Sequence, residues 1–496
     1  MADLTRRQLL RAAAATALAV KLGACSTDRN HQRALDDLRK RMKGTLLLPG
    51  DSGFVTATLP ANGRYNDIFP MAVAQCADEA DVATCVTWSR ENGVPPVSRG
   101  GGHSYAGFST TTGLLINVGL LNAANVDRAA GTAVFGGGAL NQNAYDATHD
   151  GPLFLPGGTC LGVGLGGLTL GGGIGYQTHW AGLTSDHLLS SRIVTASGEV
   201  LEIDPSHDAD LFWACRGGAG GNFGINTSFT YKLVEAPANV GFYRFDYRGA
   251  DAAGAVLSAF HRVLQAAPAA FNAVYAAQAT PVGAGGPREA IDVFTRGQYV
   301  GPLSELRDLV QPLLAAATPT KTVLQQQTFW DTFRGFASAE PPQHSFGDIS
   351  RYADRPIPDS AVAQLIDTLA ACPSRSTTAN GSFWSLGWVG GPVVDRFSRT
   401  ETAYVHRNML TLLRPTPDWP DDAPAAVGDD LLAWTDAMIR VVDAHTPAAS
   451  YQNFPNRRIQ NWQQQYYGEN FPRLVEVKRT YDRDNLFRNE QSIPTT

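Results

Sequence analysis

Residues 155–177, LPGGTCLGVGLGGLTLGGGIGYQ, constrain the fold of this chain more than any other stretch. Ten of these 23 positions are glycine, and Cys160 carries the only reactive side chain among them. Glycine loses more backbone entropy on ordering than any other residue, so neither a helix nor an ordinary strand favours this composition. The stretch therefore predicts a backbone that approaches another group closely, with one thiol beside it.

The bulk composition indicates a globular protein with a large core. The chain has 496 residues, 44% of them hydrophobic and 17% charged, which is long enough for two or more domains. Its net charge of −6 argues against nucleic acid as a partner, because nucleic-acid binding normally requires a basic surface.

The first 25 residues predict an export signal. Arg6 and Arg7 form a twin-arginine pair, followed by an Ala/Leu-rich run too short for a membrane-spanning helix. The sequence LGAC that ends at Cys25 resembles a bacterial lipobox, in which the cysteine is lipidated. We expect residues 1–25 to direct export by the twin-arginine route, which places the protein outside the cytoplasm, with a lipid anchor at Cys25 as one form. The alternative is an ordinary basic amphipathic helix.

The cysteines predict no metal site. No CxxC motif occurs, and no Cys/His cluster has zinc spacing. Cys76 and Cys85 are expected on one helix, nine residues apart and so on different faces. The pairing of these two with Cys215 and Cys372 is open, and buried free thiols are the default expectation.

The chain divides by composition. Residues 26–54 form a polar lead with one helix. From 55 to 236 strands alternate with short helices, including a helix over 77–93, a strand before Arg99 and a hairpin that turns at Ser197-Gly198. Residues 237–445 have less glycine and predict an antiparallel sheet backed by Ala/Leu-rich helices. Residues 446–496 are aromatic and polar, and the whole predicts an α+β fold.

Three glycine clusters, 100–102, 157–175 and 217–224, each lie beside a predicted strand. Bare backbone N–H groups in such turns can bind a pyrophosphate. A Rossmann fingerprint is a poor match, because none of the three clusters opens a long helix after the first strand of a βαβ unit with an acidic residue at the expected distance. No GK[ST] phosphate loop occurs in the sequence. His103 and Cys160 sit in two of these loops, so both could be bonded to one planar, electron-poor ring. Taken singly, each could equally be an ordinary packed or hydrogen-bonded group.

Several segments resemble one family. Four segments resemble FAD-linked oxidases of the vanillyl-alcohol-oxidase superfamily, in the berberine bridge enzyme-like group: VSRGGGHSYAGFST, the glycine-rich stretch around Cys160, DLFWACRGGAGGNFGINTSF and residues 466–493. The resemblance implies a two-domain fold of the PCMH type. Residues 55–236 and 446–496 would bind FAD, and 237–445 would form the substrate domain.

The resemblance also implies an FAD held by two covalent bonds, from His103 to the flavin 8α-methyl carbon and from Cys160 to flavin C6. The other residues implied to contact FAD are Arg99, Gly100, Gly101, Gly102, Ser104, Gly107, Gly157, Thr159, Val163, Gly164, Gly167, Leu168, Gly172, Gly173, Asn222, Gly224, Ile225 and Asn453.

Tyr451 is the candidate catalytic base, because the family often places a tyrosine in a Y-x-N motif after the substrate domain. Alcohol oxidation by a flavin needs a base for the O–H proton. A phenol has a pKa near 10, so it needs a cation or a hydrogen-bond network to ionise. Arg457 and Arg458 are close in sequence. The alternative is a tyrosine that only packs.

The resemblance implies that the substrate is an oligosaccharide or a secondary metabolite. Oligosaccharide oxidases of the family carry a carboxylate on a substrate-domain strand, and the matching segment here, 381–391, has none. Trp384 and Trp388 share a parity on that expected strand and would stack on a ring, or else belong to the core. Tyr404, His406 and Arg407 are expected on a strand that leads toward the cofactor, with Tyr404 as a substrate contact.

The electron acceptor is expected to be O₂, with H₂O₂ as product. In this family the residue three after the flavin-linked cysteine gates oxygen, and a small residue such as Val163 admits it. Two other readings stay open: a dehydrogenase that passes electrons to a quinone or protein, and a flavin-binding protein without turnover. A monomer and a homodimer are equally compatible with the sequence.

Overall fold

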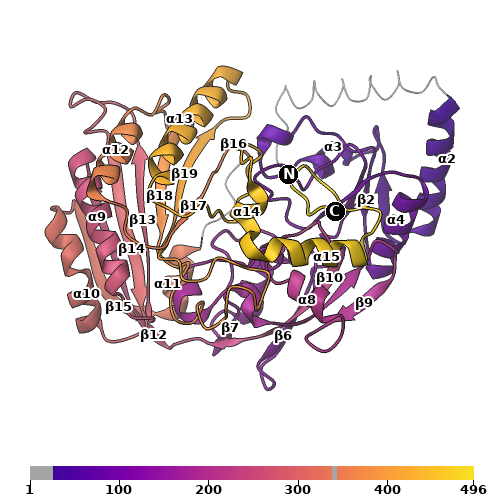
Figure 1. Cartoon of the computed structure of the whole chain (residues 1–496), viewed down its shortest axis with the longest axis horizontal. Helices are drawn as coiled ribbons and strands as arrows, with labels where there is room; N and C mark the ends of the chain where they lie inside the picture. Colours follow the sequence, from indigo (N-terminus) through magenta and orange to yellow (C-terminus); the bar gives the residue numbers. More distant parts are fainter. Residues whose placement is uncertain (1–25, 338–342) are drawn as a thin grey trace.

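Two groups of β-sheets lie side by side in the computed structural model, which describes residues 26–337 and 343–496. The first group lies on the right in Figure 1 and the second, a broad sheet, on the left. The predicted export signal, including Cys25, lies outside the described residues. Within the described parts of the chain, no helix is long and apolar enough to cross a membrane.

The first group begins with the predicted polar helix, α2 (Ser26–Arg41), followed by a four-stranded sheet. Helix α4 (Glu79–Glu91) starts where the Asp78 carboxylate accepts a hydrogen bond from the Asp81 N–H at 3.1 Å, an N-cap. This confirms the helix predicted over 77–93. The sheet has the order β1-β2-β4-β3, built from Thr45–Leu47, Ala72–Gln75, Leu114–Asn117 and Pro96–Arg99.

An antiparallel five-stranded sheet follows, with the order β5-β6-β10-β8-β9. The hairpin of β8 and β9 confirms the predicted turn, since Gly198 adopts a φ of +87°, which glycine accepts without strain. The strands are Ala124–Asp127, Thr132–Gly136, Ile225–Lys232, Leu188–Val194 and Val200–Ile203. Short helices α5 (Asn141–Thr148), α6 (Leu165–Leu170) and α8 (Ala209–Ala214) lie between them in sequence.

The second group is one antiparallel sheet of eight strands, in the order β15-β12-β14-β13-β18-β19-β16 with β17 paired to β19. Helices α9 (Ala250–Ala266), α10 (Leu303–Ala316), α12 (Asp359–Ala370) and α13 (Ala425–Asp443) cover its outer face (Figure 1). The strands, β12 to β19, are Asn239–Arg248, Phe271–Ala279, Ile291–Tyr299, Lys321–Thr328, Ser345–Phe346, Arg351–Ala353, Asn380–Leu386 and Thr411–Trp419.

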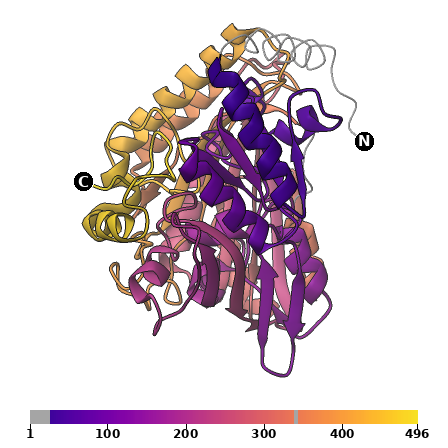
Figure 2. The same cartoon turned by 90° about the vertical axis from the view of Figure 1, so that its right-hand side faces the viewer.

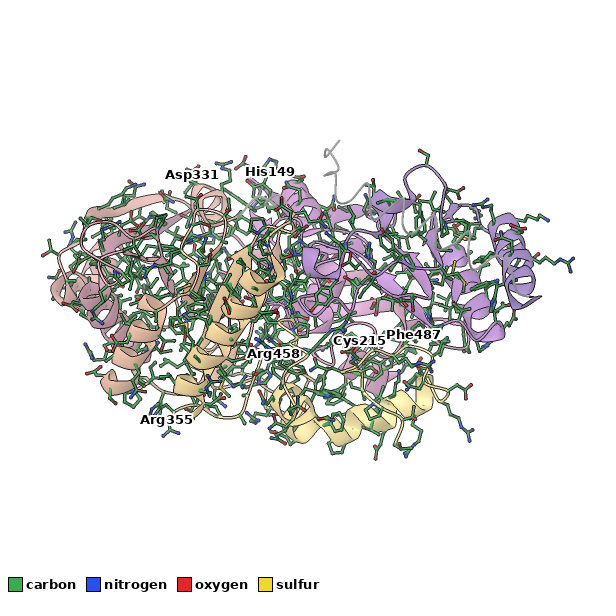
Figure 3. All side chains as sticks on the ribbon, turned by 90° about the horizontal axis from the view of Figure 1, so that it is seen from above. His149, Cys215, Asp331, Arg355, Arg458 and Phe487 are labelled. Atoms are coloured by element: carbon green, nitrogen blue, oxygen red, sulfur yellow. The ribbon has the colours of Figure 1, made fainter. Side chains whose placement is uncertain are left out.

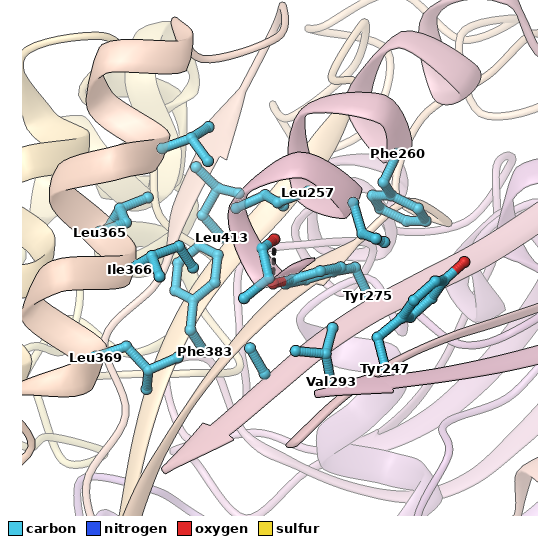
Figure 4. Close-up of a cluster of buried hydrophobic side chains, with 14 of the residues drawn as sticks. Tyr247, Leu257, Phe260, Tyr275, Val293, Leu365, Ile366, Leu369, Phe383 and Leu413 are labelled. Atoms are coloured by element: carbon cyan, nitrogen blue, oxygen red, sulfur yellow. Dashed lines mark hydrogen bonds between the residues drawn. The ribbon is translucent and has the colours of Figure 1, made fainter. Parts of the chain in front are cut away.

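Alternation along these strands divides the side chains between two faces. Figure 4 shows the helix-covered face, where Val293, Phe383 and Leu413 pack under Leu257 of α9 and Ile366 of α12. On each strand, the residues next to these in sequence point to the opposite face of the sheet. That face is turned toward the first group of sheets and is open to the site described below.

The C-terminal segment crosses back to the first group (Figures 1 and 2). Helices α14 (Trp462–Tyr467) and α15 (Phe471–Tyr481) belong to it. Lys478 is fully buried, and its ammonium donates to the Asn222 carbonyl at 2.7 Å and to the Asp482 carboxylate at 2.6 Å. Leu474 packs in the same core as Phe212. The last part of the chain thus completes the core of the first.

Two local predictions are wrong. Cys76 follows strand β2 and is not on a helix with Cys85. Residues 401–410 form no strand, because Asn408 has a φ of +59° and the Arg407 guanidinium turns inward to the Asp186 carboxylate, with two hydrogen bonds of 2.9 Å. The expectation of buried free thiols is confirmed for the four cysteines Cys76, Cys85, Cys215 and Cys372.

Candidate active site

A cavity of about 690 Å³ lies between the two groups of sheets. Its walls come from glycine loops on one side and from the open face of the eight-stranded sheet on the other. Figure 3 shows the molecule from above, with Phe487, which lines the cavity, in the first group. A space of this size is typical of a pocket for a cofactor or a drug-sized ligand.

Two glycine loops meet back to back, which brings His103 and Cys160 to one cavity. A Cβ at Gly101 would overlap the backbone of Gly164, so only glycine allows this approach. The Asn141 side-chain amide donates to the Cys160 carbonyl at 2.9 Å and fixes the second loop. His103 and Cys160 both line the cavity. The structure therefore joins two residues that are 57 positions apart in the sequence.

Another part of the cavity wall is a shallow cradle of glycine backbone, formed by Gly167, Gly220 and Gly221. A Cβ at Gly167 or Gly221 would meet nothing within 4 Å, and one at Gly220 would meet only Leu170 at 3.6 Å and Gly167 at 3.9 Å. All three glycines line the cavity, so the space beside them belongs to it. A flat group can lie against this backbone where any side chain would intrude, which fits the residues to a bound flavin dinucleotide.

Most of the predicted FAD contacts line the cavity. They are Gly100, Gly101, Gly102, His103, Ser104, Thr159, Cys160, Val163, Gly164, Gly167, Leu168, Asn222, Gly224, Ile225 and Asn453. Tyr451, Trp384 and Trp388 line it as well.

Arg99 does not line the cavity, which corrects one prediction. Its buried guanidinium donates to backbone carbonyls of Ala57 at 2.9 Å, Thr58 at 3.0 Å and Ser109 at 2.8 Å. Burial lowers the pKa of this guanidinium to about 10. Arg99 therefore fastens the end of helix α3 (Phe54–Thr58) beneath the first glycine loop.

Four of the predicted glycine contacts also lie outside the cavity lining, namely Gly107, Gly157, Gly172 and Gly173. Gly107 faces the Tyr65 ring, and Gly172 faces the Tyr404 ring, where a Cβ would overlap. Gly172 and Gly173 have φ values of +111° and +83°. Their role is to let the chain turn tightly beneath Tyr451.

The Tyr451 oxygen sits among three N–H donors. It accepts from the backbone of Gly173 at 3.1 Å and of Ile174 at 3.3 Å, and from the Asn453 side chain at 3.0 Å. Burial raises the pKa of Tyr451 to about 12, and these three hydrogen bonds oppose that effect. Donors aimed at one oxygen stabilise the phenolate more than the phenol, so the arrangement suits a tyrosine that must lose its proton.

Neither nearby arginine contacts Tyr451. Arg457 donates to the Ala106 carbonyl at 2.8 Å and pairs with Glu490 at 2.7 Å. Arg458 lies beside helix α13, where it donates to the Leu432 carbonyl at 3.1 Å (Figure 3). Of the two means of ionising the phenol considered from the sequence, the structure provides the hydrogen-bond network.

Tyr404 lies behind Tyr451 and, unlike Tyr451, does not line the cavity, so the structure does not support its predicted substrate contact. Its hydroxyl is 2.7 Å from that of Tyr352, and its ring meets the Tyr451 ring at 6.4 Å. Trp388 lies beyond the end of strand β18 at Leu386, yet it lines the cavity together with Trp384. The two tryptophans therefore line one cavity, but not for the predicted reason, which was alternation along a single strand.

The open face of the eight-stranded sheet carries polar residues that sequence reasoning missed. Strand β14 contributes Arg296, and β19 contributes Arg414, Thr416 and Asp418. Arg414 donates to the Asp348 carboxylate at 2.6 Å, which neutralises its charge. The alternation of positions 414, 416 and 418 is a signal present in the sequence, but it does not reveal which face opens to a cavity.

Comparisons with known proteins agree with this geometry. Residues 70–204 match the family described as FAD binding domain, and residues 450–494 match that described as Berberine and berberine like. The chain is 32% identical over 440 residues to YgaK, an uncharacterized FAD-linked oxidoreductase of Bacillus subtilis, covering 87% of this chain and 92% of that protein.

Two further proteins are similar in sequence or structure. Chitooligosaccharide oxidase of Gibberella zeae is 27% identical over 445 residues, covering 86% of this chain and 87% of its own. The structure of Physcomitrella patens BBE-like 1 has a TM-score of 0.82 and 25% identity, covering 93% of this chain and 99% of its own. This likeness confirms the predicted α+β fold of the PCMH type.

Proposed function

Because the chain belongs to the berberine bridge enzyme-like family of FAD-linked oxidoreductases, we propose that it oxidises a CH–OH group of a bulky, hydroxylated substrate. When bound, FAD would supply the two-electron oxidation of that carbon, with O₂ as the final electron acceptor and H₂O₂ as the product. One observation carries the proposal: three N–H donors surround the Tyr451 oxygen in the cavity that His103 and Cys160 line.

Residues of both glycine loops would hold the cofactor. His103 and Cys160 would bond its ring covalently, while the cradle of Gly167, Gly220 and Gly221 would lie against it. Two covalent bonds would keep the cofactor in place without protein on every side. The cavity could then stay open toward the eight-stranded sheet for a large substrate.

Tyr451 would act as the general base. Its phenolate would accept the proton of the substrate hydroxyl, while the donors on Gly173, Ile174 and Asn453 hold the charged form. The fully buried position of Tyr451 excludes water from the other sides of the ring. Strand β18 lacks a carboxylate, and this role of Tyr451 does not require one.

A sugar is the best-supported substrate. One relative is named a chitooligosaccharide oxidase, and Trp384 and Trp388 both line the cavity. Tryptophan faces are common platforms for the apolar faces of sugar rings. Val163 also lines the cavity, consistent with access of O₂ as its small side chain predicts.

Two measurements test the proposal. Acid precipitation of the purified protein should leave yellow flavin in the pellet, and release of all colour would exclude the covalent bonds. Anaerobic addition of oligosaccharides should bleach the oxidised flavin band, and air should restore it with release of H₂O₂.

A matched pair of variants then isolates the base. Tyr451→Phe should abolish bleaching, whereas Tyr404→Phe should not, because the Tyr404 hydroxyl bonds to Tyr352 behind the site. Equal activity of Tyr451→Phe and the unmodified enzyme would remove Tyr451 from the mechanism.

We also propose export by the twin-arginine route, on the strength of Arg6, Arg7 and the lipobox-like LGAC sequence. Replacing both arginines by lysine should retain the protein in the cytoplasm. Cys25→Ser should shift it from the membrane fraction to the soluble extracytoplasmic fraction if the cysteine is lipidated.

A further inference from the structure

One cation on the cavity wall has no carboxylate partner among the residues that the structure describes. Arg296, on strand β14, donates to the Tyr176 hydroxyl at 2.6 Å and to the Gly335 carbonyl at 3.1 Å. Both acceptors are neutral. By contrast, Arg414 on the same sheet face is neutralised by Asp348. Among residues 26–337 and 343–496, therefore, no carboxylate compensates the positive charge of Arg296 in the cavity wall.

Aromatic rings surround the Arg296 guanidinium, which they stabilise without neutralising its charge. Its guanidinium lies 5.1 Å from the Phe336 ring and 5.6 Å from the Phe294 ring, and the side chain is half-buried. Arg244 on strand β12 is its direct partner in the strand register, and Arg244 already pairs with Asp246 at 2.7 Å. Like charges placed opposite each other destabilise a sheet, and the contacts of Arg296 with aromatic rings leave its charge without a counter-ion.

Two N–H donors at the same end of the cavity have no acceptor among the described residues. One is Nε of Arg296 and the other is the indole Nε1 of Trp388, whose side chain is only 3% exposed. Tyr176 connects the two, because it accepts from Arg296 and its ring meets the Trp388 ring at 4.5 Å. Buried donors without acceptors are unfavourable, so these two indicate an acceptor group supplied by a ligand.

Tyr176 links this end of the cavity to the segment that holds Tyr451. Its hydroxyl accepts from Arg296 at 2.6 Å, and it lies two residues after Ile174, whose backbone N–H donates to the Tyr451 oxygen at 3.3 Å. Along the sheet, Arg296 is four strands from Tyr352, through Val274, Leu386 and Leu412, which is about 19 Å at ~4.8 Å per strand.

The opposite end of the cavity has the opposite charge. Asp418, which lines it there, lies six residues beyond Leu412 on strand β19, about 20 Å away at ~3.3 Å per residue. Asp418 is 3.1 Å from a ring nitrogen of His344. Arg296 and Asp418 therefore lie at different ends of the cavity wall.

We propose that the substrate carries a carboxylate, bound by Arg296 and Trp388 at the end of the cavity that Tyr176 borders. The inference rests on the proposed function and makes the substrate an acidic sugar of the uronate type. A carboxylate supplies both things the site lacks: a negative charge for the guanidinium and acceptor oxygens for two N–H donors. Arg296 would set specificity and affinity, while Tyr451 remains the base.

Ligand binding to the holoenzyme tests the charge directly. Glucuronate and glucose differ only in the carboxylate, and each can be titrated while the flavin spectrum is recorded. Glucuronate should bind at least about tenfold more tightly than glucose, as expected when a charge-assisted bond is added. Its affinity should fall as salt is raised, and glucose binding should not change.

Variants locate the effect. Arg296→Gln should weaken glucuronate binding by about 10- to 100-fold and raise KM for an acidic disaccharide with little change in kcat. Arg296→Lys should retain part of the affinity. Arg244→Gln is the matched control, because Arg244 is next to Arg296 but does not line the cavity. It should behave like the unmodified enzyme, and the resting flavin spectrum of every variant should be unchanged.

Three outcomes would overturn the inference: equal binding of glucuronate and glucose, equal losses in Arg296→Gln and Arg244→Gln, or a shifted resting spectrum in Arg296→Gln, which would place Arg296 on the cofactor. Bleaching by neutral sugars without preference for acidic ones would support the oxidase proposal and refute the carboxylate site. Arg296-dependent binding of glucuronate without bleaching by any sugar would support the carboxylate site and refute the oxidase proposal.

Discussion

Removing the Asn453 amide should impair the base without removing it. Asn453 supplies one of three N–H donors to the Tyr451 oxygen, at 3.0 Å, and the same amide donates to the Leu168 carbonyl at 2.8 Å. A hydrogen bond to a charged group contributes about 1.5–3 kcal/mol. Since one pKa unit equals about 1.4 kcal/mol, Asn453→Ala should raise the pKa of Tyr451 by about 1–2 units.

The sign of the effect on rate follows from that shift. Burial already holds the pKa of Tyr451 at about 12, so the phenolate is the minor form at neutral pH. A further rise lowers the phenolate fraction tenfold per unit, and flavin reduction should slow by about 10- to 100-fold. The alkaline rise in the rate should move to higher pH by the same 1–2 units, about the size of the pKa shift.

The assay is anaerobic stopped-flow reduction of the flavin at saturating substrate, repeated across pH. Asn470→Ala is the matched control, because Asn470 is also buried and donates to the Arg399 carbonyl at 2.8 Å, outside the cavity. Both variants should lose stability, but only Asn453→Ala should shift the pH profile. An unshifted profile in Asn453→Ala, with Tyr451→Phe inactive, would refute the donor network as the means of ionisation.

Three further predictions follow from buried groups and open space. Burial lowers the pKa of His261 to about 4, so the unfolded chain binds more protons between pH 6.5 and 4 and stability is lost as the pH falls through that range. His261→Gln should recover about 2 kcal/mol of that loss at pH 5, measured by urea unfolding at pH 7 and 5. Gly167→Ala should fold normally yet retain less flavin, since its Cβ would point into open cavity; the ratio of flavin to protein absorbance reports this, and full flavin content would contradict it. Val163→Leu should slow reoxidation by O₂ about tenfold while leaving flavin reduction unchanged, and an equal effect on both half-reactions would exclude a gate at Val163.

The glycine loops were the most predictable part of the site. Their composition demanded close backbone approach, and the contact of Gly101 with Gly164 provides it. The resemblance then assigned His103 and Cys160 to one ring, and both line one cavity. These predictions needed only residues that are close together in the sequence, because each loop contains both its glycines and its functional side chain.

Predictions failed where distant segments decide the outcome. The Arg99 side chain turns to carbonyls of residues 57–58, a contact with no local signature. Strand β18 stops at Leu386, and Gly387 packs against Leu264 of helix α9, so Trp388 leaves the strand parity. Arg296 was missed because alternation in β14 separates two faces but does not say which one faces a ligand.

The return of the C-terminal segment has a consequence for biosynthesis. Asn222, which lines the cavity, is held by the Lys478 ammonium through its carbonyl and by the Ile493 N–H through its side chain. Tyr451 and Asn453 also come from this late part of the chain. While residues 446–496 are still inside the ribosome, the third glycine loop lacks these contacts and the base is missing. We therefore expect stable cofactor binding only after this segment has left the ribosome, and truncation by a few dozen residues should yield a colourless protein.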